Sequence, residues 1–357
     1  MGHSKKLKNF HSILKDKAKI IKAKLSITNH TTSSIQIVVL RATTRTTHSP
    51  PHDHLISALI AFGLTTQYSA SACISTIINR LHHHNQPNAY VALKSLITLH
   101  HFITSGSFVH KEQTYVSNTN FGFLNLSRFV DNTDMQSKEF SLWVQWYARF
   151  LETNLSISNI LGCSLSSSKA EIDKKKEKLK FSLYMDLFKE IEGLVSTIEV
   201  ICTAPQSLHC QRNDIIYEVM RLVREDYRII QYHTMIRLTE LSNRIHKLSD
   251  SELKELTRSL ERLESCKERL GQLFLNRGRI VSFWNFESEL LRKLMLLRKD
   301  REMKLVSWKM IEYATESTQL NKQIIISSRP LELLTFVENN DWSSFDKVNQ
   351  SFCVDTA

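Results

Sequence analysis

The sequence has little glycine and little proline, with 8 and 5 residues respectively among 357. So few residues that interrupt regular structure favour long helices over a many-turned β-sandwich or a glycine-looped nucleotide fold. No apolar run approaches the roughly 18 residues that a membrane-spanning helix needs. The basic N-terminus is not followed by the apolar segment of a signal peptide. We therefore expect a helical protein that is not secreted and does not span a membrane.

Catalytic and metal-binding motifs are also missing. The sequence contains no GxGxxG, P-loop, GxSxG or HExxH pattern, so we predict that the chain is not an enzyme. The six cysteines are scattered without a CxxC pair, which favours buried, reduced thiols. The histidine runs at 82–84 and 100–101 match no metal-ligand spacing, so we predict neither a metal nor a cofactor. His100 falls inside an apolar pattern, and we expect it to be a hydrogen-bonded core residue.

Acidic residues are nearly absent from the first third of the chain. Residues 1–110 hold twelve Lys and Arg but two acids, Asp16 and Asp53, which is a surplus of ten out of the net charge of +11. This surplus indicates an anionic partner, either a phosphate-rich membrane or a nucleic acid. Residues 1–54 contain a single aromatic residue, Phe10, on which a base could stack. This scarcity makes nucleic acid the weaker hypothesis, and we expect no nucleic-acid partner.

Residues 5–25 alternate lysines with apolar residues at spacings of three and four, which predicts an amphipathic helix. Such a helix either lies on an anionic membrane or is the first helix of the domain with a solvated basic face, and the sequence leaves both readings open. Residues 26–34 are mostly Ser, Thr and Asn and are expected to form a loop. Ile35–Ala42 is short and apolar, which fits a strand or a buried helix.

Further along, helical patterns alternate with short polar loops and predict an all-α stack. The first set of predicted helices covers residues 55–61, 70–81, 89–104, 125–130 and 138–155. Residues 164–180 combine serines with a mixed charge run and are expected to be a linker. Long amphipathic helices are then predicted over 184–201, 214–241, 253–270 and 280–313, and the pattern fades from Asn321.

The segment Arg80–Gly106, RLHHHNQPNAYVALKSLITLHHFITSG, resembles the signature helices of ANTH/ENTH-domain clathrin assembly proteins. The likeness continues at 40–44, 124–129 and 143–151, and residues 262–270 resemble the plant branch of that family. The resemblance implies an ANTH-type right-handed helical stack, solenoid-like and extended by long C-terminal helices. The expected organisation is a basic amphipathic helix at 1–24, an ENTH/ANTH core at 25–163, a charged linker at 164–180, a helical extension at 181–320 and a short flexible tail at 321–357.

The resemblance also implies a function. It implies a peripheral adaptor on the cytosolic face of membranes that binds phosphatidylinositol 4,5-bisphosphate and promotes clathrin coat assembly in endocytosis. The implied partners are clathrin, adaptor-complex appendages and vesicle SNAREs, and the implied locations are clathrin-coated pits, clathrin-coated vesicles and the Golgi apparatus. The alternative is a helical module that binds SNAREs or cargo and has a weakened lipid site.

The family's lipid site is a basic residue in a "KATT" element, followed about ten residues later by a Lys-x-Lys/Arg-His/Tyr cluster. Arg41 matches the first position and His54 the last, whereas the two lysine positions between them fall on Pro51 and Asp53. Aligned on the prolines instead, His52 and His54 take the lysine positions. Either way fixed cations are lost, so headgroup binding is expected to weaken. The candidate lipid-binding residues are Arg41, Arg45, His52, His54, Lys15, Lys17 and Lys19.

The C-terminal tail carries one short motif. Trp342-Ser343-Ser344-Phe345-Asp346 resembles the WxxF-acidic ligands of adaptor appendages, with Trp342, Phe345 and Asp346 as the contact residues. Residues 333–338 narrowly miss a clathrin box. Because patterns this short arise often by chance, the sequence leaves open whether the tail binds clathrin.

Overall fold

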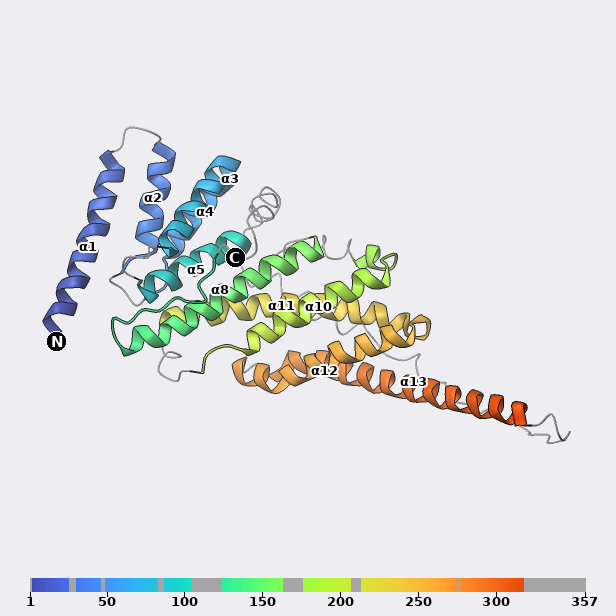
Figure 1. Ribbon diagram of the computed structural model, residues 1–357. Helices are drawn as coiled ribbons and strands as arrows, with labels where there is room; N and C mark the ends of the chain where they lie inside the picture. Colours follow the sequence, from blue (N-terminus) through green and yellow to red (C-terminus); the bar gives the residue numbers. More distant parts are fainter. Residues whose placement is uncertain are drawn as a thin grey trace. The chain divides into compact units, whose positions relative to one another are not determined.

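The computed structural model describes residues 2–25, 30–45, 49–82, 87–104, 124–162, 176–206, 213–274 and 277–317. Every regular element in these ranges is helical, which confirms the predicted all-α class (Figure 1). None of the helices described is long and apolar enough to cross a bilayer. The chain divides into a first unit, residues 1–300, and a second unit, residues 301–357.

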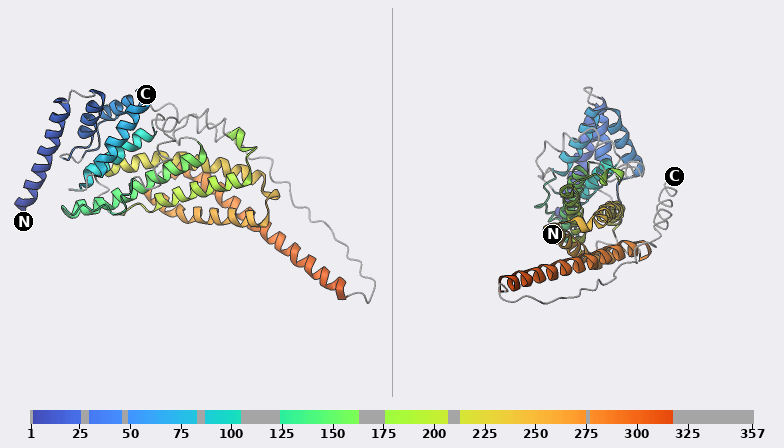
Figure 2. Two further views of the ribbon diagram at one scale, coloured as in Figure 1. Left: turned by 45° about the horizontal axis from the view of Figure 1, so that its top comes forward. Right: turned by 90° about the vertical axis from the view of Figure 1, so that its right-hand side faces the viewer.

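The first unit begins with five helices that pack on one another. They are α1 (Gly2–Leu25), α2 (His30–Ala42), α3 (Asp53–Thr65), α4 (Gln67–Leu81) and α5 (Ala89–Thr104). α1 packs on α2, and α2 also contacts α3, α4 and α5 (Figures 1 and 2). α5 is buried along almost its whole length, including its polar residues Lys94 and His100. Side chains of α5 can therefore bind the segments that join the neighbouring helices.

Four longer helices complete the core of the first unit. They are α8 (Met135–Leu161), α10 (Tyr184–Cys202), α11 (Asp214–Asn243) and α12 (Asp250–Leu273), with a 3-10 turn at Ile245–Lys247. α8 contacts both α5 and α10, and α10 also contacts α11 and α12, so these helices lie side by side (Figure 2). α8 ends at Gly162, whose φ of 59° suits glycine at a helix C-terminus. A capping box formed by Ser249 and Glu252 begins α12.

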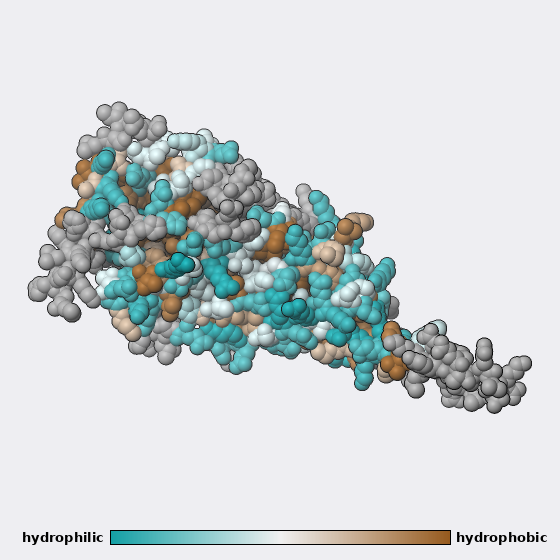
Figure 3. Space-filling view, viewed as in Figure 1, coloured by the Kyte–Doolittle hydropathy of each residue, from teal (hydrophilic) through white to brown (hydrophobic). Residues whose placement is uncertain are grey.

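The last helix, α13 (Arg277–Ser317), begins in the first unit and ends in the second. Within the first unit it buries Phe283, Trp284, Leu290, Leu291 and Leu294. Lys267 of α12 lies over the Trp284 ring, 5.8 Å from its centroid. The face visible in Figure 3 is mostly hydrophilic, and its hydrophobic residues form separate patches.

A polar network crosses the centre of the first unit. His100 Nδ1 lies 2.8 Å from the Tyr147 hydroxyl, and His100 Nε2 lies 2.9 Å from Asp226 Oδ2. Asn154 donates a hydrogen bond to the same carboxylate, so α5, α8 and α11 are joined. Burial, reinforced by the Asp226 charge, raises the pKa of Tyr147 well above its ordinary value. The prediction that His100 is a hydrogen-bonded core residue is confirmed.

Five local predictions are decided or corrected by the structure, or lie outside the described residues. α2 begins at His30, so the expected loop at 26–34 is wrong for its last five residues. Of the two alternatives for Ile35–Ala42, a strand or a buried helix, the helix is the one that forms. No helix forms at 125–130, where Asn125 has a φ of 21° and Glu152 Oε1 accepts hydrogen bonds from the backbone N–H groups of Leu124 and Asn125. The expected linker lies outside the described residues up to 175, and the expected tail lies entirely outside them.

Candidate functional site

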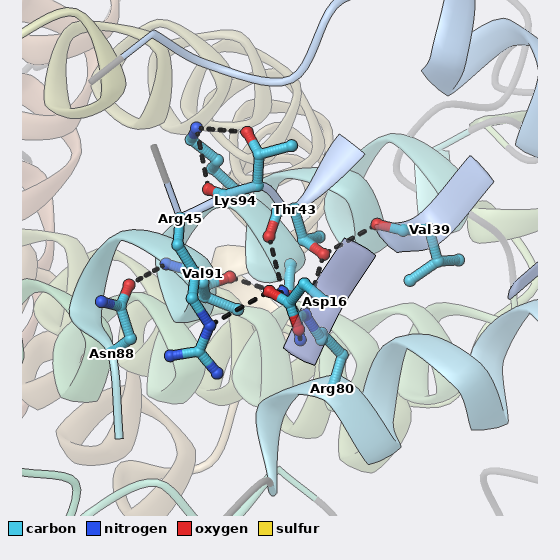
Figure 4. Close-up of polar contacts among 10 residues, drawn as sticks. Asp16, Val39, Thr43, Arg45, Arg80, Asn88, Val91 and Lys94 are labelled. Carbon is cyan, nitrogen blue, oxygen red and sulfur yellow. Dashed lines mark hydrogen bonds and ion pairs between the residues drawn. The ribbon is translucent and has the colours of Figure 1, made fainter. Parts of the chain in front are cut away.

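One carboxylate, that of Asp16 on α1, holds two arginines from other parts of the chain. Arg80 of α4 donates from Nη1 to Oδ1 at 2.9 Å and from Nη2 to Oδ2 at 2.7 Å (Figure 4). Arg45, just after α2, donates from Nε to Oδ2 at 3.1 Å. The exposed fractions of these side chains are 4% for Arg80, 9% for Arg45 and 16% for Asp16. The cluster therefore joins α1 to α4 and to the segment that follows α2.

Arg80 and Lys94 also bond the backbone where α2 ends. Arg80 donates from Nε to Thr43 Oγ1 and from Nη2 to the Thr43 carbonyl, both at 3.1 Å. Lys94 of α5 donates from Nζ to the Thr44 carbonyl at 3.2 Å, as Figure 4 shows. Carbonyls at a helix C-terminus lack intrahelical donors and carry partial negative charge, so cations are favourable partners there. Residues 43–45 are thus fixed from the interior side.

Burial and neighbouring charges shift the pKa values of several side chains in and around this cluster. Burial acts to raise the pKa of Asp16, but its bonds to Arg80 and Arg45 outweigh burial and lower that pKa below its ordinary value. Burial lowers the pKa of Lys94 to about 8. Burial also lowers the pKa of Lys19, and the nearby Arg80 charge adds to the effect. Because several cations surround one carboxylate, the interior of this region retains positive charge.

The lysines predicted on α1 divide into two groups. Lys15 and Lys17 are exposed, as are Lys22 and Lys24 further along the helix, whereas Lys19 is half-buried near the Asp16 cluster. α1 has no other acid, so its exposed face is purely cationic at these positions. The structure thereby groups Lys15 and Lys17 on an accessible surface and draws Lys19 partly inward.

The residues predicted after α2 also separate. Arg41 is exposed on the last turn of α2, and Arg45 belongs to the Asp16 cluster. His52 and His54 are exposed at the start of α3, with ring centroids 5.7 Å apart and nearly parallel rings. Asp53, exposed between them, adds a carboxylate to this group. Trp342, Phe345 and Asp346 lie outside the described residues.

Sequence reasoning missed the pairing of Arg45 with Asp16. Arg80 and Lys94 were noted only as part of the segment that resembles the family signature, and no structural role was predicted for them. In the structure they are buried cations that bind Asp16 and the backbone after α2. One signal was available, because Asp16 is the single acid among the lysines of α1. A lone carboxylate in such a helix needs a partner, but the sequence does not identify it. Among the described residues, no group of three metal-ligating side chains converges.

The all-helical stack and its cationic first helix define a helical domain with a basic exposed surface. The family model for the ANTH domain matches residues 34–284. "Putative clathrin assembly protein At4g40080" of Arabidopsis thaliana is 36% identical over 285 residues, covering 77% of this chain and 78% of the relative. The chain belongs to the ANTH-domain clathrin assembly protein family, whose members are non-enzymatic adaptors.

Two further Arabidopsis thaliana relatives agree. "Putative clathrin assembly protein At5g10410" is 33% identical over 280 residues, covering 76% of this chain and 80% of the relative. "Putative clathrin assembly protein At5g65370" is 31% identical over 301 residues, covering 80% of this chain and 98% of the relative. The family and the absence of enzymatic activity were both predicted from the sequence, and both predictions are confirmed.

Proposed function

We propose that this chain is a peripheral adaptor that binds membranes containing phosphatidylinositol 4,5-bisphosphate and promotes clathrin coat assembly in endocytosis. It acts on the cytosolic face, at clathrin-coated pits and vesicles and at the Golgi apparatus. Clathrin assembly is the activity named for its relatives. The tail motif at Trp342, Phe345 and Asp346 is proposed to engage adaptor-complex appendages, because its sequence resembles their ligands.

The observation that carries the membrane assignment is the cationic face of α1. Lys15, Lys17, Lys22 and Lys24 are exposed, and the one acid of the helix is neutralised internally by Arg80 and Arg45. A basic residue near an anionic bilayer contributes about 1 kcal/mol to binding. Lysine binds phosphate as a point charge without a fixed geometry. Attachment through α1 is therefore expected to follow total negative charge more than headgroup type.

The preference for one lipid headgroup is proposed to come from the surface formed by the C-terminal end of α2 and the N-terminal start of α3. Arg41, His52 and His54 are exposed there and are available to a phosphate. Asp53 opposes them, since a carboxylate repels an anionic headgroup. We accordingly expect a preference for the bisphosphate lipid that is smaller than a fully lysine-lined site would give.

A second candidate function is a SNARE- or cargo-binding module with a weakened lipid site. Two observations favour it. The pairing of Arg45 with Asp16 takes one cation away from the lipid surface, and the exposed Asp53 adds a negative charge to that surface. Vesicle binding separates the two candidates, because the second predicts that anionic lipid is bound only weakly.

The test is co-sedimentation with phosphatidylcholine vesicles that carry either the bisphosphate lipid or phosphatidylserine at equal total charge. The variant Lys15→Ala/Lys17→Ala/Lys22→Ala removes three exposed cations from α1. Three losses of about 1 kcal/mol each predict about 100-fold weaker binding. The matched control Lys138→Ala/Lys254→Ala/Lys299→Ala removes three exposed lysines from α8, α12 and α13.

The control is expected to bind almost as the wild type does. Equal binding by the α1 variant and the wild type would show that the lipid surface lies elsewhere. Absence of vesicle binding by the wild type would favour the SNARE or cargo module. Coat promotion is measured separately, as light scattering of purified clathrin with and without the full chain.

A further inference from the structure

The turn that leads into α10 exposes three large apolar side chains within five residues. Phe181, Leu183 and Met185 are 87%, 71% and 73% exposed. A single exposed apolar residue is ordinary on a protein surface, but a cluster on one turn points to a contact. We call residues 181–185 the apolar turn.

The fold holds the apolar turn in place from the interior side. Arg244 donates from Nη1 to the Ser182 carbonyl and from Nη2 to the Leu179 carbonyl, both at 2.8 Å. Its guanidinium also lies over the Tyr184 ring, 5.7 Å from the centroid. Glu240 accepts a hydrogen bond from Arg244 Nε at 2.6 Å and so orients the guanidinium. The backbone of the turn is thus bonded to the domain while its three apolar side chains remain exposed.

Lysines surround the apolar turn. Lys176, Lys178 and Lys180 precede it and are exposed, as is Lys189 one helical turn beyond Met185. Glu177 is paired with Lys180 at 2.9 Å, so its charge is compensated. Asp186 adds one exposed carboxylate on the first turn of α10. The region therefore combines projecting apolar groups with net positive charge.

We propose that the apolar turn inserts into the headgroup–acyl boundary of an anionic bilayer. Apolar side chains at this depth leave water, while lysine ammonium groups remain level with the lipid phosphates. Three side chains offer far less surface than the roughly 800 Å² that each partner contributes to a stable protein interface. Acyl chains need no complementary shape, so a bilayer suits this small projecting surface. The inference rests on the proposed membrane attachment and adds an insertion point to it.

Insertion and charge attraction respond differently to salt. Salt screens lysine–phosphate attraction, because the Debye length falls to about 3 Å at 1 M ionic strength. Burial of apolar groups is not screened in this way. Part of the vesicle binding should consequently persist at high salt, and that part should depend on the apolar turn.

The first arm of the test compares two triple variants on vesicles of phosphatidylcholine with one-fifth phosphatidylserine. Phe181→Ser/Leu183→Ser/Met185→Ser empties the apolar turn, and Met135→Ser/Leu142→Ser/Tyr217→Ser removes three exposed apolar side chains elsewhere. We expect the turn variant to bind at least about tenfold more weakly than the wild type and to lose the salt-resistant part. The control should bind within about twofold of the wild type, and both should keep the wild-type circular dichroism.

The second arm reads insertion directly. Phe181→Trp places a tryptophan on the apolar turn, and vesicles with brominated acyl chains should quench the added fluorescence when the full chain binds. Vesicle binding without this quenching would overturn the inference and leave the proposed function standing. A turn variant that binds as tightly as the wild type would overturn it too. Absence of wild-type vesicle binding would contradict the proposed function itself, and the inference with it.

Discussion

Arg80 and Asp16 lie 64 positions apart in the sequence and form a two-point ion pair, with nitrogen–oxygen distances of 2.9 and 2.7 Å. The pair fastens α1 to α4. The ion pair of Asp16 therefore helps to hold α1 on the domain, and with it the exposed lysines of that helix.

Replacing Asp16 with Asn should destabilise the first unit strongly. The change leaves the Arg80 and Arg45 guanidinium groups without their counter-charge in a nearly buried setting, which costs about 3 kcal/mol of unfolding free energy. Asp16 has a lowered pKa, so its stabilising effect is present above its ordinary pKa of 3.8 and is lost as the pH falls through the lower folded-state value. The measurement is urea unfolding followed by circular dichroism at pH 7 and again in acid.

Asp53→Asn is the control, because Asp53 is an exposed carboxylate in the same part of the chain. Asp53→Asn should change the free energy of unfolding by no more than about 0.5 kcal/mol. Equal stability losses for the two variants would mean that the Asp16 ion pairs contribute little.

Glu287 on α13 makes stability fall as the pH rises. Its side chain is buried, and burial, with repulsion by Glu264 as a second cause, raises its pKa from 4.5 to about 7. The unfolded chain releases this proton first, so the free energy of unfolding decreases between about pH 5 and pH 7 and stays lower above. Glu287→Gln removes the charge and should stabilise the protein at pH 8 by at most about 3 kcal/mol, with little effect at pH 5.

Thermal unfolding of the wild type and Glu287→Gln at the two pH values gives the comparison. Glu268→Gln, at an exposed position of α12, serves as the control and should show no such pH-dependent gain. A gain for Glu287→Gln that is the same at pH 5 and pH 8 would rule out proton linkage as its cause.

Two glycine-to-alanine substitutions should have opposite effects. A Cβ at Gly63 of α3 would clash with Cζ of Phe102, which is buried on α5, so Gly63→Ala should cost about 1–3 kcal/mol. A Cβ at Gly271 of α12 would meet nothing within 4 Å, and alanine there should stabilise the helix by about 0.5–1 kcal/mol. Paired denaturation curves test both, and a stabilising Gly63→Ala would show that Phe102 can move aside.

Helix positions were largely predictable, because apolar spacing is a local property of the sequence. The predicted helix at 89–104 coincides with α5, and the position of His100 in its apolar pattern correctly indicated a core residue. The errors arose where tertiary contacts override local preference. His30–Ser34 is rich in hydroxyl residues yet belongs to a helix that packs on α1. Residues 125–130 look helical, but Glu152 binds the backbone there in a non-helical conformation.

The candidate site was less predictable than the fold. Exposure of Lys15 and Lys17 follows from the amphipathic pattern of α1, whereas Arg45 resembles a free surface cation in the sequence. Its bond to Asp16 spans 29 positions, and the bond of Arg80 to Asp16 spans 64. Periodicity carries no information on pairing over such separations, so only the folded chain shows which cations are already engaged.

The bonds of Arg80 and Lys94 to the carbonyls of Thr43 and Thr44 affect the entropy cost of membrane binding at the end of α2. Ordering a free backbone costs about 1–2 kcal/mol per residue. Here that ordering is complete before any lipid arrives, so binding at the neighbouring Arg41 would forfeit little conformational entropy. Contact at this end of α2 should therefore resemble rigid-body docking, with fast association, rather than folding upon binding.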